Sequence, residues 1–228
     1  DKRELALLGD AARRLSPELL AGNYALPETD GSGVDRKVLK LAVDTLKEAG
    51  FTIKNGRMSD AQGRPLAFEL MTQNPAQERM ALAYQRSLKL IGVDMGIRSV
   101  DDGQYQSRSN SFDYDMIIRS YPSSLSPGAE QLNRWSSLSK DAQGSFNYAG
   151  AADPDIDRMI DALLQARSTE DFQAAVRAYD RLLVSQHYVI PLYYIGSQWV
   201  ARWKYIERPD MTPVFGNQKQ TWWDARAQ

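Results

Sequence analysis

The sequence predicts an α/β fold in which helices flank a central mixed β-sheet. The main observation is the stretch from Leu66 to Val100, where the alternating segment LAFELMT is followed by a helical segment and then by VDMGIRSV. A period of two is typical of a strand, and a period of three to four is typical of a helix. Strand, helix and strand within roughly thirty residues form a βαβ unit. Two long amphipathic helices and a further apolar pair of segments complete the pattern.

The part of the chain before this unit is predicted to be mainly helical. Ser16 and Pro17 start a short helical turn, because serine caps a helix and proline is tolerated at its first position. Gly50 ends a later helix, and Asn55-Gly56 is a typical hairpin turn. The predicted elements are a helix over residues 1–20, a loop over 22–33, a helix over 34–49 and a short hairpin over 51–64.

The part after the unit combines short elements with one long loop. Residues 122–150 are rich in serine, proline, glycine and asparagine, which favours a loop. Asp153 is placed to cap the helix that follows it, with Pro154 at the first position. The other predicted elements are short helices over 103–111 and 128–135, a strand over 114–121, helices over 154–166 and 169–187, and an antiparallel pair of strands over 189–196 and 198–203.

Composition excludes several classes of protein. The 228 residues carry 28 basic and 29 acidic side chains, so no basic excess indicates a nucleic acid as partner. The absence of cysteine excludes disulfides, thiol catalysis and cysteine-ligated zinc. His187 is the single histidine, so a histidine metal cluster is impossible. The chain begins with DKRELALL and has no apolar run long enough to span a membrane, so we expect a mature chain or a piece of a longer one.

Acidic side chains suggest two further kinds of site. Asp113 and Asp115 lie two apart at the start of a predicted strand, so they share a face and could act in acid–base catalysis; a solvated strand end explains the same pair. The run DPDID from Asp153 begins like a calcium loop, but Arg158 and Leu164 stand where that loop needs glycine and glutamate. Glycine-rich nucleotide motifs are absent. We therefore expect neither a metal site nor a cofactor.

Aromatic side chains in the long loop region form another candidate site. Tyr121, Trp135, Phe146 and Tyr148 lie in a segment rich in serine, proline and glycine, and not on the buried stripe of a long helix. Loops on a rigid scaffold carry many binding residues, and aromatic side chains with a few polar groups line concave sites. Alternatively, the four rings fill a small satellite core beneath the loop. The sequence favours the two interpretations equally.

Several segments, in a fixed order, resemble a known family. They are KLAVDTLKEAGF (40–51), GRPLAFELMTQN, LKLIGVDMGIRSVDDGQY, FDYDMII, NYAG followed by DPDIDRMID, and YVIPLYY. This set resembles the family 5 extracytoplasmic solute-binding proteins, the oligopeptide, dipeptide and nickel receptors of bacterial ABC importers. SLSPGAEQLNRWSS (124–137) and GSFNYAG (144–150) resemble the YejA-like branch, which is associated with import of microcin C and of murein-derived peptides.

The resemblance implies the C-terminal lobe of a type II periplasmic binding protein, whose two lobes close on a ligand. It implies a ligand-binding lobe over residues 1–204 and a tail over 205–228 that crosses back to a missing N-terminal lobe. The implied partners are a peptide or peptide-like ligand, the membrane permease of the importer and that N-terminal lobe. The implied location is the periplasm.

The resemblance also carries over part of a binding site. Peptide-binding relatives have an aromatic residue after the strand that FDYDMII matches, which corresponds to Tyr121, and then an aspartate that holds the ligand's amino terminus. Ser124 stands near that acidic position, which implies a ligand whose amino end is blocked or bound elsewhere. Arginine pairs with carboxylates through its planar fork. The implied ligand-binding residues are Arg119, Tyr121, Ser123, Ser124, Arg134, Trp135, Asn147 and Tyr148.

Together these patterns favour the substrate-binding component of an importer over an enzyme. A hydrolase that uses Asp113 and Asp115 is the alternative, and it requires the two carboxylates to converge in a cleft. A structural or protein-interaction domain is a third interpretation, which predicts a flat apolar patch in place of a cleft.

Overall fold

The chain divides into two compact units, unit 1 from Asp1 to Tyr188 and unit 2 from Val189 to Gln228. The computed structural model describes residues 1–121, 126–214 and 216–227. Unit 1 ends before residue 204, where the resemblance places the end of the ligand-binding lobe. That the segment over 205–228 crosses to a second lobe stays a prediction.

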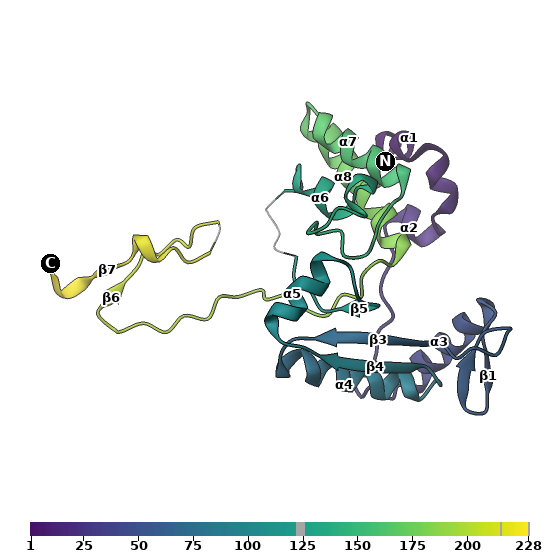
Figure 1. Cartoon of the computed structure of the whole chain (residues 1–228). Coiled ribbons are helices and arrows are strands. Elements are labelled where there is room, and N and C mark those ends of the chain that lie inside the picture. The colour runs from purple at the N-terminus through teal and green to yellow at the C-terminus, as the bar shows by residue number, and fades with distance from the viewer. Residues whose placement is uncertain (122–125, 215, 228) are drawn as a thin grey trace. The chain divides into compact units, whose positions relative to one another are not determined.

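Unit 1 combines a parallel three-stranded sheet, a small hairpin and α-helices (Figure 1). Its helices are α1 (Lys2–Leu8), η1 (Gly9–Arg14), α2 (Pro17–Ala21), α3 (Arg36–Glu48), α4 (Pro75–Lys89), α5 (Asp102–Asn110), α6 (Glu130–Trp135), η2 (Ser137–Ser139), α7 (Pro154–Gln165) and α8 (Thr169–Gln186), where η marks a 3-10 helix. Its strands are β1 (Thr52–Lys54), β2 (Arg57–Ser59), β3 (Ala67–Thr72), β4 (Asp94–Ser99) and β5 (Met116–Ile117). The predicted α/β class is confirmed.

The predicted βαβ unit, β3–α4–β4, forms the centre of the sheet. β3 lies between β4 and β5 and runs parallel to both, with Leu70 opposite Met116 of β5. The side chain of Asn74 caps α4 by accepting from two backbone N–H groups of its first turn. α4 lies along the strands (Figure 1), and its Ala81 packs with Leu70 and Met95 in an almost fully buried cluster.

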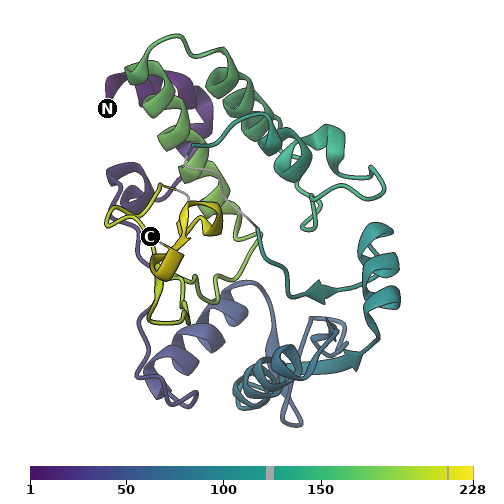
Figure 2. The same cartoon turned by 90° about the vertical axis from the view of Figure 1, so that its left-hand side faces the viewer.

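A second core lies among α1, α2, α7 and α8, which gather together in unit 1 (Figures 1 and 2). Leu8, Ile156, Ile160 and Leu182 are completely buried there. Their helices each present one apolar stripe to the others, as amphipathic helices do. Full burial of one such side chain contributes about 1.5–3 kcal/mol, so this core is a main source of the stability of unit 1.

Several predicted strands differ from the structure. The strand expected over 114–121 is reduced to β5, because β3 pairs with two of its residues and the chain then leaves the sheet. The antiparallel pair expected over 189–196 and 198–203 does not form among these described residues. Their side chains are largely exposed, with Trp199 at 96%, so no sheet surface holds them as strands. Among the described residues the central sheet is parallel, whereas the sequence predicts a mixed one.

Unit 2 contains little regular structure. Its elements are β6 (Ile206–Glu207), which pairs antiparallel with β7 (Trp223–Asp224), and the 3-10 helices η3 (Lys219–Thr221) and η4 (Ala225–Ala227). Trp203 stacks on Tyr205 with ring centroids 6.1 Å apart, and the guanidinium carbon of Arg226 lies 3.4 Å from the Tyr205 centroid. These contacts are local, and Trp203 stays 72% exposed.

Candidate functional site

Five residues of unit 1 form a chain of ring contacts, and we call them the aromatic cluster. Tyr121 stacks on Trp135, with ring centroids 5.5 Å apart and planes at 30°. Tyr148 contacts Tyr121 at 5.9 Å and Phe146 at 6.0 Å between centroids. Trp135 also stacks on Tyr188, at 6.1 Å. The structure thus brings together the four aromatic residues that the loop pattern singles out and adds Tyr188.

Both the sheet and the helical core position the aromatic cluster. Tyr121 follows the carboxyl end of β5, the side of an open parallel sheet on which ligands usually bind. Trp135 is the last residue of α6. Tyr188 follows α8 and packs against the helical core. The hydroxyl of Tyr114 donates to the backbone oxygen of Tyr148 at 2.9 Å, and that of Tyr121 to the backbone oxygen of Phe146 at 3.4 Å. These bonds hold the loop against the strand.

Asn147 supports this loop from inside. Its side chain is completely buried. Its amide nitrogen donates to the backbone oxygens of Ser136 at 3.1 Å and Ala151 at 2.9 Å, and its amide oxygen accepts from the backbone N–H of Ala151 at 2.7 Å. A buried amide engaged in this way cannot reach a ligand. The implied ligand contact of Asn147 is therefore not supported, and Asn147 instead positions Phe146 and Tyr148.

Two arginines lie beside the aromatic cluster. The guanidinium carbon of Arg134 is 5.7 Å from the ring centroid of Tyr121. That of Arg119 is 4.9 Å from the ring centroids of both Tyr105 and Tyr148. These distances fall within the range of cation–π attraction, which contributes about 0.5–2 kcal/mol. The two arginines place positive charge next to the rings, and the carboxylate of Glu130 interacts with the charge of Arg134.

Burial keeps the phenols around the arginines uncharged. It raises the pKa of Tyr114 to about 12, and the neighbouring Tyr148 adds to the rise. Burial also raises the pKa of Tyr121 and of Tyr105, although the charge of Arg119 lowers both in part. The phenols therefore stay neutral at physiological pH and do not compensate the arginine charges. Their hydroxyls act as hydrogen-bonding groups and carry no charge.

The structure adds residues to this site that the sequence did not single out. Tyr105 is the one aromatic residue in the polar helix α5; it is completely buried, and its hydroxyl donates to the backbone oxygen of Ile118 at 2.6 Å. A single aromatic residue in a polar helix is a signal that could have found Tyr105. Tyr188 gave no such signal, because its position depends on how α8 packs. Ser123 and Ser124 lie outside the described residues.

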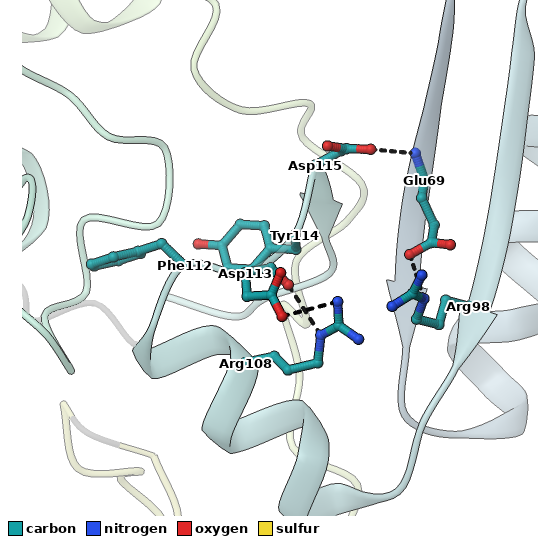
Figure 3. Close-up of a pocket in the computed structure, with 7 residues that line it drawn as sticks. All are labelled: Glu69, Arg98, Arg108, Phe112, Asp113, Tyr114 and Asp115. Carbon is teal, nitrogen blue, oxygen red and sulfur yellow. Dashed lines mark hydrogen bonds and ion pairs between the residues drawn. The ribbon is translucent and has the colours of Figure 1, made fainter.

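A polar pocket contains the two carboxylates of the hydrolase alternative (Figure 3). It has a volume of about 420 Å³ and is lined by Glu69, Arg98, Arg108, Phe112, Asp113, Tyr114 and Asp115. Asp113 pairs with Arg108 at 3.1 Å, whereas Asp115 accepts from the backbone N–H of Glu69 at 2.9 Å. Figure 3 shows the two side chains directed to these different partners. The carboxylates do not converge as an acid–base pair requires.

The described part of the chain has neither a cluster of potential metal ligands nor a membrane-spanning helix. No group of three or more histidine, aspartate or glutamate side chains in residues 1–121, 126–214 and 216–227 could hold a metal ion. Within the same residues, every helix is too short or too polar to cross a bilayer.

Several proteins similar to this chain are named as binding proteins. Residues 7–143 match the family of bacterial extracellular solute-binding proteins, family 5 (middle). The whole chain is 84% identical to the peptidoglycan-binding protein YepA of Agrobacterium fabrum, of which it covers 37%. Over 99% of its length it is 36% identical to the probable peptide-binding protein YejA of the same organism, again covering 37%. The chain thus spans little more than a third of the length of these curated relatives.

Solved structures share the fold. The oligopeptide-binding protein AppA from Bacillus subtilis, in complex with a nonapeptide, matches with a TM-score of 0.59 at 18% identity, over 81% of this chain and 38% of that chain. At this identity the likeness shows the fold alone. It agrees with the type II periplasmic binding protein fold that the sequence resemblance implies.

Proposed function

This chain belongs to the family 5 bacterial extracellular solute-binding proteins, and from that membership we propose that it forms the C-terminal ligand-binding lobe of the substrate-binding component of an ABC importer. The ligand we propose is a peptide or peptide-like molecule. The observation that supports a ligand of this class is the aromatic cluster at the carboxyl end of β5, with two arginines beside it. Apolar rings with a few charged groups suit a peptide, which has both apolar side chains and ionised groups.

The relatives narrow the class of ligand. One is a peptidoglycan-binding protein and another a probable peptide-binding protein. We therefore favour murein-derived peptides. Peptide antibiotics of the microcin C type are the second candidate, on the resemblance to the YejA-like branch.

The proposed receptor has further parts and partners. The curated relatives are long enough to hold an N-terminal lobe, since this chain covers 37% of each. We propose that the exposed apolar segment over 189–203 and the tail over 205–228 pack against that lobe. The closed receptor then delivers its ligand in the periplasm to the permease, and it performs no hydrolysis because Asp113 and Asp115 are engaged with separate partners.

Titration of the ¹⁵N-labelled chain with the murein tripeptide L-Ala-γ-D-Glu-meso-diaminopimelate tests the proposal. We expect shifts at the indole of Trp135 and at the backbone of Tyr121 and Tyr148. Trp135→Ala should weaken binding at least about tenfold, as loss of a central aromatic anchor does. The control Trp199→Ala removes a tryptophan that is 96% exposed and should leave binding unchanged. Shifts confined to the β1–β2 hairpin, or an equal effect of the two variants, would refute this site.

A further inference from the structure

The indole of Trp135 lies at the end of a helix that cannot fix its orientation alone. α6 has six residues, and its N-cap residue, Ala129, has no side-chain group that could accept a hydrogen bond. Isolated helices of this length are unstable in water, so packing against other elements must hold α6 in place. Trp135 is its last residue and is half-buried. The orientation of the indole therefore depends on the side chains that pack against it.

α8 and the residues that follow it contact α6 at two points. The hydroxyl of Tyr179 donates to the side-chain oxygen of Gln131 at 2.8 Å, and both side chains are almost completely buried. About one turn further along α6, Tyr188 stacks on Trp135, with ring centroids 6.1 Å apart and planes at 27°. Tyr179 thus holds the start of α6, and Tyr188 contacts the ring at its end.

The turn that ends α8 determines where Tyr188 lies. His187 has a left-handed conformation, with φ at +52°, and its backbone N–H donates to the backbone oxygen of Val184. A residue in this conformation commonly ends a helix, and histidine adopts it more readily than most residues. Tyr188 then packs against the same helical core as Trp135. Its position is therefore set by the helical core and not by the loop of the aromatic cluster.

The phenol of Tyr188 lies next to an ion pair. Burial raises the pKa of Tyr188, and the charge of Asp153 adds to the rise, whereas the charge of Arg14 opposes it. Arg14 donates to both carboxylate oxygens of Asp153, at 3.0 and 3.3 Å, and Asp153 caps α7 by accepting from the backbone N–H of Asp155. Asp153 is only 8% exposed. The groups beside the phenol thus belong to η1 and to the start of α7, which supports Tyr188 from the core.

The two ends of the aromatic cluster have different surroundings. At one end the guanidinium groups of Arg134 and Arg119 lie over the rings of Tyr121 and Tyr148. At the other end Tyr188 packs against the helical core. This difference favours ligand contacts at the end that carries the arginines, and a supporting role for Tyr188.

We propose that Tyr188 is a positioning residue, which holds the indole of Trp135 in the orientation that contacts the ligand without touching the ligand itself. This inference rests on the proposed function, because it explains how one ring of that site is aligned. Stacked aromatic pairs stabilise each other beyond the effect of their buried area. A ring that is already aligned loses less conformational freedom on binding, which strengthens binding.

A double-mutant cycle tests this role. The wild-type chain, Tyr188→Leu, Trp135→Ala and the double variant are titrated with the murein tripeptide L-Ala-γ-D-Glu-meso-diaminopimelate, and binding is followed at the backbone N–H of Tyr121. Tyr188→Leu should weaken binding to an otherwise wild-type chain about two- to tenfold. It should have no further effect in the Trp135→Ala background, because it acts through the indole. Equal weakening in both backgrounds would mean that Tyr188 contacts the peptide directly, and it would overturn the inference.

Two further variants separate positioning from a loss of stability. Tyr24 is also half-buried, packs against the same helical core and contacts the ring of His187 at 6.4 Å between centroids. Tyr24→Leu should destabilise the core as Tyr188→Leu does, but it should leave peptide binding unchanged. Tyr188→Phe keeps the ring, so it should recover most of the binding that Tyr188→Leu loses. Equal weakening by Tyr24→Leu and Tyr188→Leu, or no recovery in Tyr188→Phe, contradicts the proposed role.

Measurements on the free chain do not depend on peptide binding. The ¹⁵N order parameter of the Trp135 indole N–H, assigned by its loss in Trp135→Ala, reports fast motion of this ring. It should fall in Tyr188→Leu and stay at the wild-type value in Tyr24→Leu. Nuclear Overhauser contacts between the rings of Trp135 and Tyr188 should be present in the wild-type chain, which tests the stack even if Tyr188→Leu does not fold. Missing ring contacts, or an order parameter that Tyr188→Leu does not change, would refute the positioning role.

The outcomes distinguish this inference from the proposed function. If the peptide binds the wild-type chain but Tyr188→Leu behaves like Tyr24→Leu, the inference fails while the proposed function stands. If Tyr188 orders the indole in the free chain but no peptide binds, the proposed peptide binding fails, and the alignment of Trp135 for a ligand fails with it. Support for the inference requires both the order-parameter change and the loss of the Tyr188 effect in Trp135→Ala.

Discussion

At the scale of single residues, Asn147 is the side chain on which the loop of the aromatic cluster depends. Its replacement by alanine leaves both the backbone oxygen and the backbone N–H of Ala151 without their buried partner, whereas the backbone oxygen of Ser136 keeps two donors from Ser139. Each buried polar group left without a partner costs about 1–3 kcal/mol. We therefore expect Asn147→Ala to lower the free energy of unfolding by about 3 kcal/mol, measured by urea denaturation with fluorescence detection.

The matched control for this change is Asn133→Ala. Asn133 lies on α6, near the same loop, but its side chain is exposed. A surface substitution of this kind usually changes the free energy of unfolding by less than about 0.5 kcal/mol. Equal losses for the two variants would show that Asn147 has no special structural role.

The sequence predicts those residues of the candidate site that stand out by residue type alone. Tyr121, Trp135 and Tyr148 stand out because aromatic side chains are unexpected in a loop rich in serine, proline and glycine. The internal role of Asn147 could not be predicted, because its partners come together only when the loop folds back on itself. The shielding of Arg119 likewise depends on tertiary contacts that no local pattern encodes.

At the scale of elements, the turn between α4 and β4 depends on Gly92. Its φ of +79° lies in the left-handed region, and a Cβ there would lie 2.8 Å from the backbone nitrogen of Met58 and 3.0 Å from the backbone oxygen of Gly56. The left-handed conformation costs a non-glycine residue about 1–2 kcal/mol, and the overlap with backbone adds about 1–3 kcal/mol. We expect Gly92→Ala to lower the free energy of unfolding by at least about 2 kcal/mol in urea denaturation.

Gly63→Ala separates the two contributions. Gly63 has nearly the same φ, +80°, but nothing lies within 4 Å of the position of its Cβ. This variant should lose only the conformational part, about 1–2 kcal/mol. If Gly63→Ala were as destabilising as Gly92→Ala, the close approach of the hairpin to the α4–β4 turn would not matter.

The sequence predicts the elements that local patterns determine, and it fails for elements that depend on a partner far away in the chain. The βαβ unit is visible because its three segments have clear periods and because Pro75 stands near the start of the helical segment. Strand formation over 114–121 and 189–203 was overestimated, since an apolar alternating segment becomes a strand only where a neighbour pairs with it. A helix carries its own hydrogen bonds, and the predicted helices are accordingly present, except that the one expected over 1–20 is divided into α1, the 3-10 helix η1 and α2.

At the scale of the whole molecule, this chain offers only part of the contacts that the proposed two-lobed receptor would make. Closure of two lobes buries a ligand from both sides. Binding costs about 4–15 kcal/mol in lost translational and rotational freedom. This cost stays the same when the ligand makes only half of the contacts. A loss of about 4 kcal/mol in contact energy therefore weakens binding about a thousandfold.

We accordingly expect the 228-residue chain to bind a murein peptide about a thousandfold more weakly than a full-length relative such as the peptidoglycan-binding protein YepA of Agrobacterium fabrum. Calorimetry on the relative and NMR titration of this chain measure the two dissociation constants. The residual interaction should still involve Arg119, Tyr121 and Trp135, because the sheet and the helical core of unit 1 already hold these side chains in place. If the chain bound as tightly as the full-length relative, contacts from a second lobe would contribute nothing to affinity, and the proposal of a two-lobed receptor would have to be abandoned.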